Sequence, residues 1–253
     1  MQAPRIHSEC GSPVLDSEIE DMRAVLETPT AYWPRLRDWV NASTDPEVQR
    51  DRQLVLMLCR PKAFYPTGRQ ASKILRLKER AEASIFDAWC KQPDFDLLTL
   101  EAIFEGGVKI ADWGEEAQPR PSSAKGIYLI VWNKRPPVHF EEIGTGSHFK
   151  RDPNVQIKTL EENWIPESCV LYIGKAAAKK EGLRGRLNQY IRFGAGKSSP
   201  HKGGRYIWQL RERSELLVYW KELPNEEPRS VEKLLLQEFE KQYGRLPFAN
   251  LRR

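Results

Sequence analysis

The stretch that decides the fold lies at residues 169–193 and reads CVLYIGKAAAKKEGLRGRLNQYIRF. Its first part, Cys169–Gly174, is a short apolar run that ends at a glycine, which is typical of a buried strand. A basic loop follows, and from about Leu183 to Phe193 the apolar residues recur at helical spacing. The stretch therefore predicts a strand, a loop and a helix in succession.

Further predicted elements stand on either side of this stretch. The apolar run Gly126–Trp132 predicts an earlier strand. The residues between the two strands, at about 134–167, contain several Pro and Gly residues and are expected to form an insertion. Later strands are expected at Arg205–Leu210 and Leu216–Leu223. Together these segments predict a small, mainly antiparallel sheet.

The last helix is expected at about Ser230–Tyr243. Ser230 suits an N-cap, because its hydroxyl can accept a hydrogen bond from a free amide of the first turn. Gly244 suits the helix end, because glycine readily adopts the left-handed conformation found there.

The first half of the chain is predicted to be helical, because between residues 14 and 106 apolar side chains recur at helical spacing. Asp16 suits the N-cap of a first helix, and Asp45, followed by Pro46, suits the start of another. The longest pattern runs from Gln70 to Trp89. The sequence of this half contains no recognisable arrangement of catalytic residues.

A change of composition marks the expected domain boundary. The stretch at 113–125, WGEEAQPRPSSAK, is polar and rich in Pro and Ser. We therefore expect a helical domain of unknown role at 1–115 and a second domain at 122–253. The expected fold class is α+β, with the helical domain followed by a small antiparallel sheet flanked by helices.

Charge is distributed unevenly along the chain, whose formal net charge is +5. Residues 1–119 carry 15 Lys or Arg and 20 Asp or Glu, whereas residues 120–253 carry 25 and 15. Within 172–213 there are 11 basic side chains, opposed by Glu181 and Glu212. Such a local excess favours a polyanionic partner, because each phosphate that is bound releases condensed counterions. The alternative is a solvated basic face.

Several classes of protein are excluded by the sequence. No run of about 18 apolar residues exists, so no membrane span is expected. The first residues lack the apolar core of a signal peptide, and we expect a cytoplasmic protein. The four cysteines are far apart, which argues against a disulfide framework or a zinc site. A phosphate loop at 194–198, GAGKS, is rejected because the Walker pattern needs a glycine where Ile191 stands.

A set of chemically distinctive residues follows a fixed order through the second half. It comprises Gly126-Ile127-Tyr128, Tyr172-Ile173-Gly174-Lys175, Arg186, Tyr190, Glu232 and Asn250. In order and kind these residues resemble the GIY-YIG nuclease family, over about residues 125–253. The resemblance implies a metal-dependent endonuclease that hydrolyses phosphodiester bonds of DNA, double-stranded in the first place, with Mg²⁺ or Mn²⁺ as cofactor. The interval from Tyr128 to Tyr172 is longer than is usual in the family.

The two motif tyrosines are the candidates for activating water. On neighbouring antiparallel strands, Tyr128 and Tyr172 can point their hydroxyls into one pocket. A phenol has an ordinary pKa near 10, but a nearby cation such as Lys175 would favour the phenolate. As the resemblance implies, a motif tyrosine helps to activate the water. We assign this role to Tyr172, with Tyr128 second.

Arg186 lies where the family has its phosphate-clamping arginine. Its planar guanidinium suits paired phosphate oxygens and keeps its charge. Tyr190, four residues on, shares the same helix face and matches a family position filled by tyrosine or histidine. Arg184 is the competing arginine, but it faces elsewhere on a helix.

Glu232 resembles the family's metal-binding glutamate, and a carboxylate suits Mg²⁺, which needs few protein ligands. Glu238 and Glu240 are alternatives, and Glu227 is a more distant one. Asn250 resembles the family's terminal asparagine, which supports the site by hydrogen bonding.

Basic residues near the predicted helix are further candidates for contacting DNA. They are Arg184, Lys197, His201, Lys202 and Arg205. His201 could contact a phosphate or assist proton transfer, although a loop histidine more often does neither.

Two functions of different class remain open. One is an active endonuclease, and the alternative is a non-catalytic nucleic-acid-binding module that keeps the fold. The joint presence of tyrosines, arginine and Glu232 favours the enzyme, because binding alone needs no acidic residue facing a phosphate. A protein-interaction role fits only the acidic first half, and a homodimer is left open.

Overall fold

The computed structural model describes residues 16–28, 30, 32–60, 64–133, 138–147, 152–177, 181–199 and 203–251. The chain divides into two compact units, Met1–Asp87 and Ala88–Arg253. The first unit is helical and the second contains a four-stranded sheet, so the fold class is α+β, as predicted. None of the helices in these described ranges is long and apolar enough to cross a membrane.

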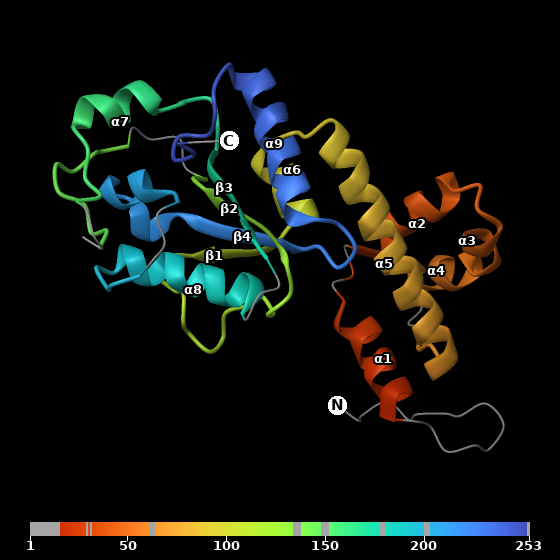
Figure 1. Ribbon diagram of the computed structural model, residues 1–253. Helices are drawn as coiled ribbons and strands as arrows, with labels where there is room; N and C mark the ends of the chain where they lie inside the picture. Colours follow the sequence, from red (N-terminus) through yellow and green to blue (C-terminus); the bar gives the residue numbers. More distant parts are fainter. Residues whose placement is uncertain are drawn as a thin grey trace. The chain divides into compact units, whose positions relative to one another are not determined.

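Helices build the first unit around one apolar core (Figure 1). They are α1 (Asp16–Glu27), α2 (Tyr32–Ala42), α3 (Pro46–Arg50), α4 (Arg52–Leu58) and the greater part of α5 (Gly68–Lys91). Trp33, Val55 and Ile74 are among the buried residues that join these helices. The predicted helices are present, although the segment at 46–58 forms two helices that meet at Asp51.

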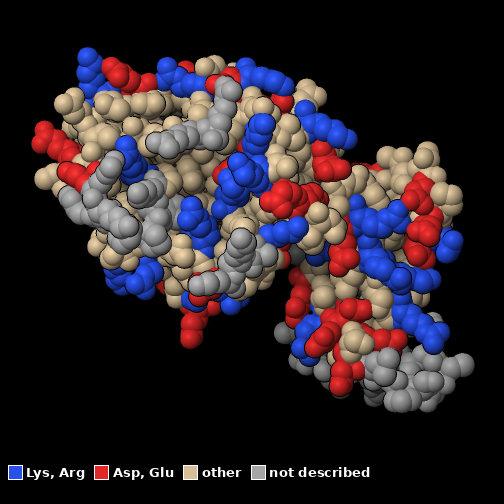
Figure 2. Space-filling view, in the orientation of Figure 1, with Lys and Arg blue, Asp and Glu red and all other residues tan. Residues whose placement is uncertain are grey.

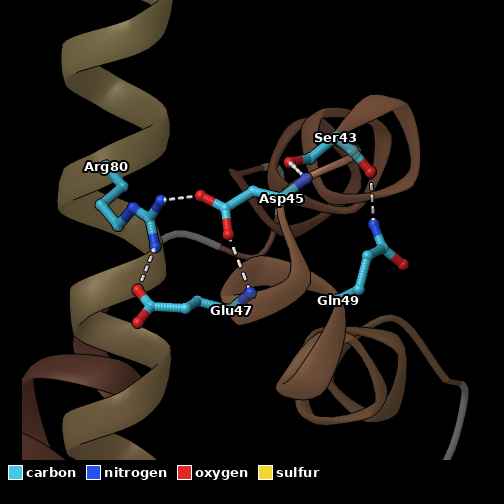
Figure 3. Close-up of polar contacts among 5 residues, drawn as sticks. All are labelled: Ser43, Asp45, Glu47, Gln49 and Arg80. Carbon is cyan, nitrogen blue, oxygen red and sulfur yellow. Dashed lines mark hydrogen bonds and ion pairs between the residues drawn. The ribbon is translucent and has the colours of Figure 1, made fainter.

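The start of α3 shows how local sequence fixes this unit (Figure 3). Asp45 is the N-cap, as predicted, and its carboxylate accepts a hydrogen bond of 2.8 Å from the Glu47 amide. The Gln49 side chain donates to the Ser43 carbonyl at 2.7 Å. Arg80 of α5 forms ion pairs with both Asp45 and Glu47. The cap and the ion pairs together hold α3 beside α5.

The second unit consists of an antiparallel sheet with helices packed on it. Its elements are α6 (Leu97–Ile103), β1 (Glu105–Lys109), β2 (Gly126–Val131), α7 (Ile157–Asn163), β3 (Val170–Ala176), α8 (Gly182–Gly194), the 3₁₀ helices η2 (Arg205–Gln209) and η3 (Arg213–Glu215), β4 (Leu217–Glu222) and α9 (Pro228–Tyr243). The strand order is β1-β4-β2-β3, and every neighbouring pair is antiparallel. Strand β2 is central, which explains why all six of its residues are apolar or glycine apart from one tyrosine and all are buried.

Helices α8 and α9 lie on opposite faces of the sheet (Figure 1). In the β2–β3 register Tyr128 is opposite Gly174 and Ile130 is opposite Tyr172, so both tyrosines share one face. That face packs on α8, because Leu183 and Leu187 belong to the same core. The alternating positions of β2 and β3, such as Leu129 and Ile173, point to the opposite face of the sheet, toward α9. Strand β3 ends the sheet, and its outer edge is therefore open to other parts of the chain.

The structure differs from the predicted elements and from the predicted domain boundary in several places. Strand β1 was not expected, since Gly106 and Gly107 give it little strand propensity, and it forms because β4 offers a pairing edge. It belongs to the second unit together with α6, so the chain divides after Asp87 and not in the predicted stretch at 113–125.

The strand predicted at Arg205–Leu210 is wrong, because this segment is the 3₁₀ helix η2. Its apolar residues Tyr206, Ile207 and Trp208 are buried consecutively and do not alternate, and Leu210 donates to the Ile207 carbonyl at 3.1 Å.

Helix α9 begins two residues before the predicted start. Ser230 is not its N-cap, since the helix starts at Pro228, a residue preorganised for the first turn, and the N-cap is Glu227. The predicted end is confirmed, because Gly244 has a φ of 73° and its amide donates to the Glu240 carbonyl.

Candidate active site

Three tyrosines from β2, β3 and α8 form one cluster. The ring centroids of Tyr128 and Tyr172 are 5.9 Å apart, and those of Tyr172 and Tyr190 are 6.2 Å apart with nearly parallel rings. Tyr128 and Tyr190 are 0% exposed, whereas Tyr172 is 7% exposed and lines a cleft. The predicted convergence of the two motif tyrosines is thus observed, and Tyr172 is the member of the cluster that reaches the cleft.

Gly174 is the residue that makes room for this cluster. A Cβ placed on Gly174 would lie 2.4 Å from Cζ and 2.6 Å from the hydroxyl oxygen of Tyr128. No side chain fits in that space, so the glycine of the second motif is required by the ring of the first. The two motifs are therefore physically coupled across the β2–β3 pair.

Arg186 supplies the cation of the tyrosine cluster. Its guanidinium hydrogen-bonds Tyr128, and its charge acts on both Tyr128 and Tyr172. Arg184, two residues earlier on α8, is exposed and donates from Nε to the Pro121 carbonyl at 3.1 Å. The two arginines face different ways, as the helical geometry predicted, and Arg186 is the one beside the tyrosines.

Burial dominates the electrostatics of the tyrosines. Desolvation raises the pKa of Tyr128, and Arg186 acts against it. Desolvation also holds the pKa of Tyr172 well above its ordinary value, with the neighbouring Tyr128 adding to the effect. The prediction that Lys175 favours a phenolate needs correction. The cation that lowers these pKa values is Arg186, and removal of the rings from water outweighs it.

Lys175 instead forms an ion pair with Glu232 of α9. The pair follows from the sheet register, because Lys175 is opposite Ile127 and so faces α9, away from the tyrosine rings. Glu232 is 15% exposed, and its negative charge raises the pKa of Tyr172 slightly. The carboxylate, the lysine and the tyrosines consequently share one neighbourhood.

The alternative glutamates lie elsewhere or have other partners. Glu238 forms an ion pair with Lys241, and Glu227 is the N-cap residue of α9. Glu240 lines the same cleft as Glu232. The residues that the structure describes contain no group of three or more His, Cys, Asp or Glu side chains able to hold a metal ion. The Glu232 and Glu240 carboxylates alone leave the shell of a Mg²⁺ ion incomplete, so waters and substrate oxygens would have to supply its other ligands.

Asn250 completes the open edge of β3. Its side-chain oxygen accepts a hydrogen bond of 2.9 Å from the Ile173 amide, and its side-chain nitrogen donates to the Ile173 carbonyl at 2.8 Å. The next residue back, Ala249, donates from its amide to the Leu171 carbonyl at 2.9 Å. Both ends of the Asn250 side-chain amide bind Ile173, which lies on β3 between the site residues Tyr172 and Lys175. Asn250 therefore holds this part of the strand in position.

The cleft has a volume of 1240 Å³ and runs beside β3. Tyr172, Lys175, Glu232 and Asn250 line it, together with residues from η2, from the chain after α9 and from the described parts of the insertion. Figure 2 shows Lys and Arg side chains distributed over the visible face of the second unit, with Asp and Glu side chains among them.

The residues predicted to contact DNA differ in whether they line the cleft. Arg205 lines the cleft. Lys197 is exposed just after α8, and among the described residues it is not part of the cleft wall. His201 and Lys202, and residues 178–180 of the predicted basic loop, lie outside the described residues. Sequence reasoning gave no role to Gly203-Gly204, although this pair before Arg205 also lines the cleft.

Comparison with protein families, with curated proteins and with solved structures found no match for this chain.

Proposed function

We propose that the second unit is a metal-dependent endonuclease that hydrolyses phosphodiester bonds of DNA in the cleft beside β3. One observation carries this proposal: Tyr172 and Glu232 line the same cleft, and the Arg186 guanidinium acts on Tyr172 from the side of α8. The three groups come from α8, α9 and β3. A purely structural aromatic cluster needs neither charge.

Arg186 would bind the phosphate to be cut, because its planar guanidinium matches two phosphate oxygens and stays charged. Tyr172 is a neutral phenol at neutral pH, since burial holds its pKa high. Its oxygen can accept a hydrogen bond from the attacking water and so orient it. A base role requires that the pKa of Tyr172 fall when the site is occupied.

Glu232, with Glu240 on the same cleft wall, would hold the divalent cation, Mg²⁺ or Mn²⁺. Such a cation supplies positive charge that lowers the pKa of a bound water and stabilises negative charge at phosphorus. Lys175 holds the Glu232 carboxylate at the cleft when no cation does so. The proposal includes double-stranded DNA as substrate and a cytoplasmic location.

A non-catalytic DNA-binding module is the second candidate function. The Lys175–Glu232 ion pair favours it, because the pair uses the carboxylate that an enzyme would need for its cation. Under this alternative the cleft would hold DNA without cutting it.

Nicking of a supercoiled plasmid with Mg²⁺, with Mn²⁺ or with EDTA tests the proposal. We expect cutting that depends on the cation and falls by about 10²-fold or more in Glu232→Gln and Arg186→Ala, the loss typical for a group that stabilises transition-state charge. Glu238→Gln on α9 and Arg192→Ala, at an exposed position in the last turn of α8, are the matched controls and should cut normally.

DNA affinity, measured by fluorescence polarisation, separates the two candidate functions. Glu232→Gln should bind DNA about as well as the unchanged protein does. A wild-type protein that binds DNA but cuts with neither cation would support the binding module. Cutting that survives both Glu232→Gln and Arg186→Ala would rule out this site.

A further inference from the structure

Arg205 lines the candidate active-site cleft, and none of the described carboxylates forms an ion pair with it. Arg205 begins η2 and lines the same cleft as Tyr172 and Glu232. Within the described part of the chain its Nε is shielded from solvent without a hydrogen-bond partner, and no described carboxylate forms an ion pair with it. Arg205 as a whole is only partly buried at the cleft, so the terminal nitrogens of its guanidinium are the donors that an incoming acceptor could reach.

The position of Arg205 is fixed by its neighbours. Its guanidinium carbon lies 5.7 Å from the ring centroid of Tyr206, in a cation–π contact that holds the side chain over the ring. The backbone before it is equally constrained, because Gly204 has a φ of 67°. A Cβ placed on Gly204 would lie 3.0 Å from Cε2 of Tyr190 and 3.4 Å from Cγ of Tyr172. The turn that presents Arg205 therefore rests on the tyrosine cluster itself.

The other cations among the described residues of the cleft wall are already engaged. Lys175 is paired with Glu232, and Arg245 donates to the Glu162 carbonyl. Asp152, Glu162 and Glu240 also line the cleft and would repel an anion. Among the cleft-lining residues that the structure describes, Arg205 is thus the cation best placed to attract a phosphate.

We propose that Arg205 binds a phosphate next to the one that is cut, so that the substrate is a polynucleotide and not an isolated phosphodiester. This inference rests on the proposed nuclease function. Arg186 serves the phosphate at the tyrosines from α8, whereas Arg205 approaches the cleft from η2, a separate element. The cleft volume of 1240 Å³ exceeds the ~300–1,000 Å³ of common small-molecule pockets, which leaves room for more than one nucleotide.

Two substrates show whether Arg205 binds a phosphate beside the scissile bond or is needed for hydrolysis of any phosphodiester. A short duplex DNA has phosphates beside the scissile bond, and bis(p-nitrophenyl) phosphate has none. For Arg205→Ala we expect kcat/KM on the duplex to fall about 10- to 100-fold, as for loss of a charge-assisted hydrogen bond, mainly through KM. For the same variant, kcat/KM on bis(p-nitrophenyl) phosphate should change less than about threefold. Arg186→Ala should impair both substrates.

Arg245→Ala is the matched control, because it removes the same charge from the same cleft. Its effect on the duplex should be clearly smaller than that of Arg205→Ala. Equal effects of the two variants, or equal losses on both substrates in Arg205→Ala, would overturn the inference. Arg205→Lys keeps the charge and should restore part of the lost affinity, which guards against a variant that has merely misfolded.

The salt dependence of DNA binding tests Arg205 even if no hydrolysis is found. Measured in the Glu232→Gln background, the slope of log Kd against log salt should decrease by about 0.9 on adding Arg205→Ala, the value expected when the protein neutralises one phosphate fewer. An unchanged slope would overturn the inference. Absence of cutting by the unchanged protein on both substrates would instead refute the proposed function and leave this measurement valid.

Discussion

Asn250→Ala should destabilise the second unit by removing the amide that completes the edge of β3. The side chain makes two hydrogen bonds to one residue, accepting from the Ile173 amide at 2.9 Å and donating to the Ile173 carbonyl at 2.8 Å. Both bonds are partly buried. The substitution leaves a donor and an acceptor of β3 without these partners, in the strand that carries Tyr172 and Lys175.

The magnitude follows from these two bonds. A hydrogen bond contributes about 1 kcal/mol net, and a buried group left unpaired costs about 1–3 kcal/mol. Since water can reach part of this edge, we expect a loss of about 2–3 kcal/mol in the free energy of unfolding. For a unit of this size, that loss lowers Tm by roughly 5–10 °C.

Thermal and urea unfolding followed by circular dichroism measure the effect. Asn188→Ala is the matched control, because Asn188 accepts a single exposed hydrogen bond, from Trp113. The control should lower the free energy of unfolding by less than about 1 kcal/mol. Asn250→Asp keeps the acceptor but sets a carboxylate oxygen against the Ile173 carbonyl, so it should lose at least as much stability as Asn250→Ala. A Tm for Asn250→Ala within about 1 °C of the unchanged protein would refute the reasoning, because the two bonds would then add nothing.

Three further predictions follow from the site. Gly174→Ala should disrupt the tyrosine cluster, because its Cβ would lie 2.4 Å from Cζ of Tyr128; we expect a loss of about 1–3 kcal/mol from overpacking, measured by urea unfolding. Stability should fall as pH rises above about 10, because burial raises the pKa of Tyr190 above its unfolded value, so the unfolded chain loses protons first. Tyr190→Phe should flatten that fall, and an identical pH profile would contradict it. Lys175→Met should tighten Mn²⁺ binding about two- to fivefold by freeing Glu232, as measured by calorimetry; weaker binding would show that Lys175 does not compete.

The local sequence determined where the helices and strands form. It also determined which side chains share one face of a helix or of a pair of strands. The period of apolar residues predicted β2, β3 and α8, because each segment records which of its own side chains are buried. Alternation along two paired strands is enough to place Tyr128 and Tyr172 on one face. Helical spacing likewise separated Arg186 from Arg184.

Only the tertiary structure decided which groups meet across the fold. Strand β1 exists because β4 offers it an edge, and its Gly-rich sequence gives little sign of this. Lys175 pairs with Glu232 and not with the tyrosines, because the register turns its side chain toward α9. The positions of Asn250 and Arg205 in the site depend on contacts with residues that are distant in the sequence. Periodicity reports burial within one segment, whereas the choice of a partner depends on how several segments pack together.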